Sequence, residues 1–263
     1  MIRKLTALCT TFLNDNRVFF YYCLSYIWAI KIPQLQTLSD TQLSEELKSG
    51  KSLIRVGDGE AMISMGRSVH YQDFHSELQF DIKSIIKSYS PDSPYILAVP
   101  FFAIQNSPTE LRAKKRFRIW RLFRAFFKIR FNHAVGYADA VMFYHSNAFA
   151  DTLAAHLRGK KVILVTKQDN MTLELKKALA LLSDNITYIV SPTTNAYNTI
   201  SKTIQLIDTA CGNTLPEKLV ILVAIGPAAK SLTYHYAKKS YQALDIGHGI
   251  EIIGQTKDYS DRL

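Results

Sequence analysis

The segment Arg55-Val56-Gly57-Asp58-Gly59-Glu60 contains the residue types most suited to chemistry in this chain. The carboxylates of Asp58 and Glu60 are two residues apart, and the glycines on either side of Asp58 let a ligand approach the backbone closely. Carboxylates spaced in this way on a loop can converge on one hard cation, Mg²⁺ or Mn²⁺, which usually carries a substrate phosphate. The alternative is a tight turn with solvated acids. We favour the cation site, because the acids follow an apolar run, residues 53–56, that predicts a buried strand.

The elements that must position these acids alternate regularly along the chain. Short runs rich in Val, Ile and Leu predict strands, and apolar residues at helical spacing predict helices. The predicted strands are residues 53–56, 95–99, 140–144, 161–166, 186–190, 219–225 and 241–245. The predicted helices are residues 41–47, 77–88, 148–157, 171–182, 197–209 and 228–239. This order predicts an α/β fold of Rossmann-like type, with a mostly parallel sheet covered by helices on both faces. A G-x-G-x-x-G fingerprint is absent from the sequence, so a standard dinucleotide-binding module is not supported.

Three further segments follow predicted strands, at the edge where open parallel sheets bind ligands. Residues 191–197 offer hydroxyl and amide groups, including those of Thr194 and Asn195. The segment Gly226-Pro227-Ala228-Ala229-Lys230 is either an anion cradle at a helix start or a plain strand-to-helix turn. The segment Asp245-Ile246-Gly247-His248 ends a strand with an acid and a histidine, which could ligate a metal or exchange a proton.

Three of these segments together resemble the motifs of a known family. Residues 55–60 match R-x-G-D-G-E, residues 226–232 match G-P-x-A-x-x-L, and residues 243–248 match A-x-D-I-G-H. The GT-D-fold glycosyltransferases carry such motifs in this order and at similar separations. The resemblance extends over about residues 38–253 and implies a domain that moves a sugar from a nucleotide-diphosphate sugar, with UDP as the expected nucleotide.

The resemblance also implies a cofactor and roles for individual residues. A divalent cation, typically Mn²⁺ (or Mg²⁺), is expected at Asp58 and Glu60, with the family's terminal histidine falling on His248. Asp245 and His248 are then a second metal contact or the base that deprotonates the acceptor hydroxyl, and these two roles stay open. The predicted donor-binding residues are Arg55, Gly57, Gly59, Thr194, Asn195, Gly226, Pro227 and Ala228. Arg55 could equally be structural. The implied acceptor is a glycan, a glycoprotein or a lipid-linked molecule in surface polysaccharide or glycoconjugate assembly.

The net charge of +10 is concentrated in one segment of the 263 residues. Its basic residues, with no acid between them, are Arg112, Lys114, Lys115, Arg116, Arg118, Arg121, Arg124, Lys128 and Arg130. On a helix, several of these charges share one face and aromatic and aliphatic residues occupy the other. This pattern predicts a basic amphipathic insertion at residues 111–131 that lies on an anionic membrane surface. Two alternatives are open: the apolar face packs on the core, or the segment binds nucleic acid, which is disfavoured because no known nucleic-acid module surrounds it.

The remaining composition concerns compartment and domain limits. Three widely spaced cysteines suggest a reduced, intracellular protein without a disulfide framework. The aromatic run at residues 18–30 is about 13 residues long, which is too short to cross a bilayer. We therefore predict an N-terminal helical, membrane-interfacial segment at 1–37, a glycosyltransferase domain at 38–263, and a cytoplasmic location at the inner face of the cell membrane. The non-enzymatic alternative is a membrane-tethered module that binds a nucleotide or nucleic acid without transferring a sugar.

Overall fold

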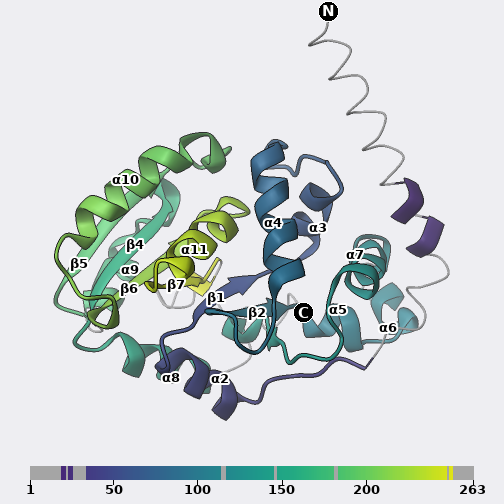
Figure 1. Ribbon diagram of the computed structural model, residues 1–263, viewed down its shortest axis with the longest axis horizontal. Helices are drawn as coiled ribbons and strands as arrows, with labels where there is room; N and C mark the ends of the chain where they lie inside the picture. The colour runs from purple at the N-terminus through teal and green to yellow at the C-terminus, as the bar shows by residue number, and fades with distance from the viewer. Residues whose placement is uncertain are drawn as a thin grey trace, which may run out of the picture.

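A seven-stranded parallel sheet forms the centre of the protein (Figure 1). The computed structural model describes residues 19–21, 23–25, 34–113, 117–144, 147–180, 183–247 and 249–250. The strands are β1 (Ser52–Arg55), β2 (Tyr95–Val99), β3 (Ala138–Asp139), β4 (Lys161–Lys167), β5 (Ile186–Ser191), β6 (Leu219–Ala224) and β7 (Gln242–Asp245). Their order in the sheet is β3-β2-β1-β7-β6-β4-β5.

The central strands are apolar on both faces. Along β1, Leu53 contributes to one core cluster and Ile54 to another on the opposite face; Val162 and Ile163 of β4 do the same. Successive side chains of a strand point to opposite faces, so a strand buried on both sides needs a continuous apolar run rather than an alternating one. This requirement explains why the strands can be predicted from the sequence.

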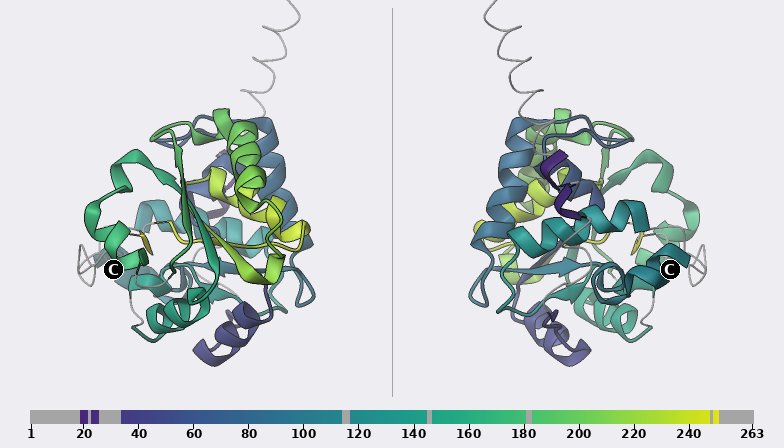
Figure 2. Two further views of the ribbon diagram at one scale, coloured as in Figure 1. Left: turned by 90° about the vertical axis from the view of Figure 1, so that its left-hand side faces the viewer. Right: turned by 90° about the vertical axis from the view of Figure 1, so that its right-hand side faces the viewer.

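Helices cover both faces of the sheet (Figures 1 and 2). On one face lie α2 (Asp40–Lys48), α8 (Asn147–Leu157) and α9 (Leu173–Ala180), whose buried leucines share a cluster with Leu53 and Val162. On the other face lie α4 (Ser76–Ser88), α10 (Ile200–Cys211) and α11 (Ala228–Lys238). The predicted fold class, an α/β fold with a parallel sheet between two helical layers, is confirmed.

Shorter elements complete the structure beside the sheet. The helices among them are α3 (Asp58–Ser64), α5 (Phe101–Gln105), α6 (Pro108–Ala113) and α7 (Phe117–Arg130). The 3₁₀ turns are η1 (Met142–Tyr144), η2 (Gln168–Asn170), η3 (Ala196–Thr199) and η4 (Pro216–Lys218).

The chain reverses its direction of travel across the sheet beside β1. From β1 it proceeds outward to β2 and β3, and it then returns through β4, β5 and β6 to β7, which pairs with β1 from the other side. Loops on the two sides of such a reversal lead away from each other and leave a crevice at the carboxyl ends of the strands. The fold therefore places the ligand-binding edge at the ends of β1, β7, β6 and β4.

The predicted strand at residues 140–144 is wrong. The ladder to β2 contains only Ala138 and Asp139, and η1 follows. The Asp139 carboxylate accepts hydrogen bonds from the backbone N–H groups of Val141 and Phe101, at 3.1 and 3.2 Å. A carboxylate that bonds the backbone two residues ahead closes a local turn, and this ends the strand despite the apolar residues that follow.

Helix α7 packs into the core, and part of the basic face predicted at residues 111–131 is buried with it. The side chains of Phe123 and Phe127 are buried in the core, and those of Arg121 and Arg124 are only 5% and 3% exposed. Arg124 Nη1 donates to the carbonyl oxygens of Ala103 and Asn106, at 3.0 and 2.6 Å, at the end of α5. These two charges serve the interior and are not available to headgroups or to nucleic acid.

The N-terminal segment is described only in part, so the boundary predicted at residue 37 stays a prediction. Residues 19–21 and 23–25 are helical. Tyr21 packs against Phe126, and Arg130 Nε donates to the Tyr21 hydroxyl at 2.6 Å. Among the described residues, no helix combines the length and the apolar character that a bilayer span requires.

Candidate functional site

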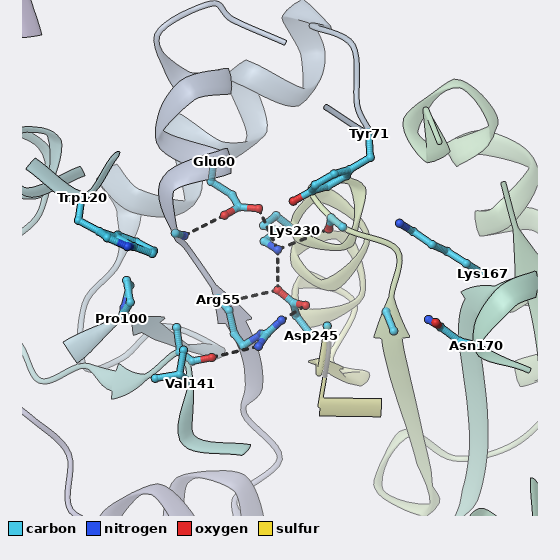
Figure 3. A pocket seen from close by; sticks show the side chains of 15 residues that line it. Arg55, Glu60, Tyr71, Pro100, Trp120, Val141, Lys167, Asn170, Lys230 and Asp245 are labelled. Carbon is cyan, nitrogen blue, oxygen red and sulfur yellow. Dashed lines mark hydrogen bonds and ion pairs between the residues drawn. The ribbon is translucent and has the colours of Figure 1, made fainter. Parts of the chain in front are cut away.

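A pocket of about 260 Å³ opens at the carboxyl edge of the sheet, beside the point where the chain reverses (Figure 3). Its floor comes from the ends of β1, β6 and β7 and from the starts of α3 and α11. Its rim comes from the end of β4, from the loop between α3 and α4, and from α7. Three of the four predicted strand-end segments, at residues 55–60, 226–230 and 245–247, therefore contribute to one cavity, as the rule for parallel sheets requires.

Glu60 lies on the first turn of α3 and not on a loop. Its Oε2 accepts a hydrogen bond of 2.8 Å from the N–H of Gly57, which precedes the helix. This contact is the acidic half of a capping box and satisfies one N–H that the helix start leaves unpaired. The side chain is held over the pocket, and it is only 9% exposed. The glycine-bracketed acids thus begin a helix whose first residue is Asp58.

Lys230 lies at the centre of the floor, between two carboxylates. Its Nζ is 3.0 Å from Glu60 Oε1, 3.0 Å from Asp245 Oδ2 and 3.4 Å from the carbonyl oxygen of Gly226. Burial alone lowers the pKa of this ammonium, but the carboxylates of Asp245 and Glu60 outweigh burial and raise the pKa above its ordinary value. Lys230 is therefore a permanent positive charge.

Arg55 and Asp245 join the first and last motifs across the β1–β7 pair. The Arg55 N–H donates to Asp245 Oδ2 at 3.2 Å, and its Nη1 donates to the carbonyl oxygen of Ala140 at 3.0 Å. Arg55 Nε and Asp245 Oδ1 are 3.7 Å apart, and neither makes a hydrogen bond to the described residues. The guanidinium lies so close to Gly247 that a Cβ there would be 1.6 Å from Nη2. Only glycine fits at that position, which also has φ +43°.

The rim opposite the floor carries Tyr71 and Lys167. The Tyr71 ring packs against Gly226, where an added Cβ would be 2.9 Å from Cε2, and its hydroxyl points toward Glu60 and Lys230 (Figure 3). Burial and the Glu60 charge raise the pKa of Tyr71 to about 12. Lys167 Nζ lies 5.1 Å from the centroid of this ring, and burial lowers the pKa of Lys167. The rim thus offers an aromatic face and a second ammonium.

A tryptophan and an asparagine extend the two sides of the pocket. Trp120 of α7 reaches the wall beside Pro100 and packs edge-on against Phe102, with ring centroids 4.9 Å apart. Asn170, at the end of η2, borders the side of Lys167, and its amide nitrogen donates to Thr166 Oγ1 at 3.0 Å. Figure 3 shows Trp120 and Tyr71 on opposite sides of the Lys230 cluster.

Asp58 is the candidate cation ligand whose carboxylate is not engaged in an ion pair among the described residues. Burial and then the neighbouring Glu60 charge raise its pKa above 3.8. Among the described residues, the Asp58 carboxylate is in no ion pair, and no three His, Cys, Asp or Glu side chains gather in a way that would hold a metal. His248, the third predicted ligand, lies outside the described residues. Two neighbouring carboxylates with one unpaired fit a hard cation in donor chemistry.

The other predicted donor-binding residues divide into three groups. Gly57 and Gly226 line the pocket, whereas Gly59, Pro227 and Ala228 lie beside it, with Ala228 fully buried at the start of α11. Thr194 and Asn195 do not reach the pocket.

Asn195 has a structural task instead. It adopts a left-handed conformation, φ +53°, and its N–H donates to the carbonyl oxygen of Tyr71 at 2.9 Å. Its side-chain amide exchanges two hydrogen bonds with Asp73, of 2.6 Å to the backbone N–H and 2.8 Å to the carboxylate. Asn195 therefore fixes the loop that carries Tyr71.

Sequence reasoning assigned no site role to Lys230, Lys167, Asn170, Tyr71 or Trp120. Two signals were available. Lys230 follows Gly226 by four residues, which on a helix places it one turn above the strand end. Lys167 and Asn170 directly follow a predicted strand and obey the same edge rule as Asp58. Tyr71 lies in a long loop, and nothing in its local sequence indicates where it packs.

Comparisons with known proteins agree with this geometry. The family model described as "Glycosyltransferase GT-D fold" matches residues 53–253. Among curated proteins, the chain is 24% identical over 237 residues to glycosyltransferase GlyD of Streptococcus pneumoniae serotype 4 (strain ATCC BAA-334 / TIGR4), covering 83% of this chain and 27% of that protein. It is 26% identical over 228 residues to the probable glycosyl transferase Gly of Streptococcus gordonii, covering 82% and 32%. The chain thus spans about a third or less of the length of these relatives.

Solved structures share the fold. A domain of unknown function 1792 superposes with a TM-score of 0.71 at 21% identity, covering 90% of this chain and 86% of that chain. A glycosyltransferase containing the same domain, from Streptococcus sanguinis, superposes with a TM-score of 0.65 at 22% identity, covering 87% and 85%. At such identities the likeness concerns the fold alone.

Proposed function

Because this chain belongs to the family of glycosyltransferases with the GT-D fold, we propose that its pocket binds a nucleotide-diphosphate sugar and passes the sugar to an acceptor hydroxyl. Breaking the bond between sugar and diphosphate leaves negative charge on the diphosphate, and stabilising that charge is the main electrostatic task of such a site.

The observation that supports this proposal best is the charge of the pocket. Three cationic side chains line it, Arg55, Lys167 and Lys230, against two carboxylates, Glu60 and Asp245. The lining, which does not include Asp58, therefore carries a formal excess of one positive charge. In a partly dry cavity that excess attracts an anion more strongly than it would in water. Lys167 on the rim is the ammonium nearest to open space, and we assign it to the diphosphate.

A metal belongs to the proposal. Asp58 and Glu60 would hold Mn²⁺ or Mg²⁺, with His248 as a proposed third ligand outside the described residues. When bound, the cation would share the charge that develops on the leaving diphosphate. Asp245 is assigned to holding Lys230 and Arg55 in place, since both cations contact its carboxylate.

The aromatic walls are proposed to receive the flat parts of the donor. The faces of Tyr71 and Trp120 lie on opposite sides of the Lys230 cluster (Figure 3). A nucleobase can stack on one such face and a sugar ring can pack on the other. We propose UDP as the nucleotide on the strength of the family resemblance.

The acceptor is proposed to be a glycan, a glycoprotein or a lipid-linked molecule of surface polysaccharide assembly. A lipid-linked acceptor would require the enzyme to work at the inner face of the cell membrane. The side chains of Phe19 and Phe20, 67% and 56% exposed, are the apolar groups available for such a contact. We propose these two side chains for the membrane contact in preference to α7, because Arg121 and Arg124 of α7 are buried.

A panel of nucleotide sugars, scored for release of free nucleoside diphosphate with and without Mn²⁺, tests the proposal. We expect release from one UDP-sugar, abolished by Asp58→Asn without loss of the folded state. The matched control is Asp40→Asn, which changes another aspartate in the first turn of a helix, α2, remote from the pocket. Binding of UDP with no release from any donor would leave only a nucleotide-binding module and would defeat the proposal of sugar transfer.

A further inference from the structure

The position between Glu60 and Asp245 is already filled by a cation, the ammonium of Lys230. The carboxylates belong to the start of α3 and the end of β7, and Lys230 enters between them from α11. Nζ is 3.0 Å from an oxygen of each carboxylate. In a metal-dependent site, two acids from different elements that face each other in this way usually bind one divalent cation between them.

The ammonium has no donor to spare for a ligand. Its three N–H groups have three acceptors within the protein: one oxygen of Glu60, one of Asp245 and the carbonyl oxygen of Gly226. The side chain is only 6% exposed. Lys230 is therefore built into the floor and holds three elements together, whereas Lys167 at the rim is free to turn toward a diphosphate.

We infer that Lys230 is a positioning residue that acts as a built-in cation. Together with Arg55 it balances the charges of Glu60 and Asp245, and it excludes a divalent metal from the space between them. The metal of the proposed reaction is then confined to the Asp58 side of Glu60, and Asp245 is not one of its ligands.

The charge of the site explains what this arrangement achieves. With Lys230 the pocket lining has a formal charge of +1, and replacing Lys230 by a neutral residue reduces it to zero. A divalent cation in the same place would raise it to +2. The lysine keeps both acids oriented before any donor binds. This inference deepens the proposed function, and its second experiment rests on that function.

The first experiment asks whether removing the lysine creates a metal site. Thermal unfolding of the whole chain is followed with EDTA and with about 1 mM Mn²⁺, in the absence of nucleotide. We expect Mn²⁺ to raise the Tm of Lys230→Met by roughly 5 °C or more and that of the wild type by less than roughly 2 °C. The added Asp245→Asn should abolish the gain. The matched control, Lys239→Met, removes a lysine that pairs with Asp208 at the exposed end of α11 and should respond as the wild type does. Absence of a Mn²⁺ gain in folded Lys230→Met overturns the inference.

The second experiment does not require the Lys230 variant to fold. Mn²⁺ is titrated into the UDP-saturated wild type, Asp245→Asn and Asp58→Asn. We expect Asp245→Asn to change the Mn²⁺ affinity by less than about threefold and Asp58→Asn to weaken it by about tenfold or more. A tenfold loss in Asp245→Asn would place the metal between the carboxylates and overturn the inference. No Mn²⁺ binding to any of the three proteins would contradict the metal of the proposed function, and the first experiment would still decide the role of Lys230.

Discussion

The floor and the rim of the pocket are built on different principles. The floor consists of Arg55, Glu60, Lys230 and Asp245, and the last three are 7%, 5% and 1% exposed. Each of these side chains is tied to another element by an ion pair or a hydrogen bond. The rim consists of Tyr71, Lys167 and Asn170 on one side and Trp120 on the other. Tyr71 is 39% exposed, and the Lys167 ammonium lies loosely over its ring, 5.1 Å from the centroid.

This difference indicates that the floor and the rim have different roles. Buried charges are costly unless they are paired, so the floor is rigid: moving one member would leave another uncompensated. The rim has few fixed polar contacts and can adapt to a ligand at little cost. We therefore expect changes in the floor to act mainly on stability and changes in the rim mainly on binding.

Lys230→Met should have the largest effect on stability. It leaves Glu60 and Asp245 buried and facing each other with no cation between them, which should lower the free energy of unfolding by about 3–5 kcal/mol. The measurement is chemical denaturation at neutral pH in EDTA. The control, Lys239→Met, breaks an exposed ion pair and should cost less than about 0.5 kcal/mol. Equal costs for the two variants would show that the floor is not a closed network.

Gly247→Ala should have the second-largest effect on stability, because it disturbs the packing of the floor. The new Cβ would occupy the position of the Arg55 guanidinium, which must leave Asp245 and Ala140, and alanine must also adopt φ +43°. We expect a loss of roughly 2–3 kcal/mol. Gly159→Ala separates the two causes, since Gly159 has φ +75° but nothing within 4 Å of an added Cβ. Its cost should be only the backbone strain, roughly 1 kcal/mol. A Gly247→Ala protein as stable as Gly159→Ala would contradict the close packing of Arg55.

Lys167→Met should show the opposite profile at the rim. The variant removes an ammonium that we assign to the diphosphate, so the affinity for UDP should fall about tenfold, equivalent to about 1.4 kcal/mol. The Tm should change little, because Lys167 makes no ion pair among the described residues. Lys176→Met, at an exposed position of α9, is the control for a general loss of positive charge. Calorimetric titration of UDP checks the affinity, and an unchanged value would remove Lys167 from the site.

The sequence predicts the sheet well because a strand that is buried on both faces is apolar along its own length. Residues 219–225 and 162–165 are apolar throughout, and this pattern does not depend on any distant partner. The strand expected at 140–144 fails because one side chain, Asp139, ends it. Helix α7 shows a different limit. Its periodicity correctly predicts a helix, but the local sequence does not indicate that Arg121 and Arg124 are buried or that Arg124 donates to the carbonyl oxygens of Ala103 and Asn106.

The site is predictable to the extent that it lies at strand ends. Arg55, Glu60, Gly226 and Asp245 all meet there, as their positions after strands suggest. Their pairing is not predictable, because Lys230 approaches from α11, and the sequence does not say how far a helix rises above the sheet. Asn195 illustrates the converse, since its amide and its place after β5 suit a ligand while its partner is Asp73.

The Asp58→Asn substitution should have the smallest effect on stability. It also tests most directly whether Asp58 belongs to the paired charges of the floor. Its pKa is raised above 3.8, first by burial and then by Glu60, so the native state binds its proton more tightly than the unfolded state does. This carboxyl therefore contributes stability at acid pH, and the contribution is lost as the pH rises from 3.8 through the raised native value. We expect the free energy of unfolding of the wild type, relative to Asp58→Asn, to fall over that window. Urea denaturation of both proteins from pH 4 to pH 7 measures it, with Asp40→Asn as the control. A difference that rises with pH instead would mean that Asp58 has a cationic partner and belongs to the paired floor, leaving no free carboxylate for a metal.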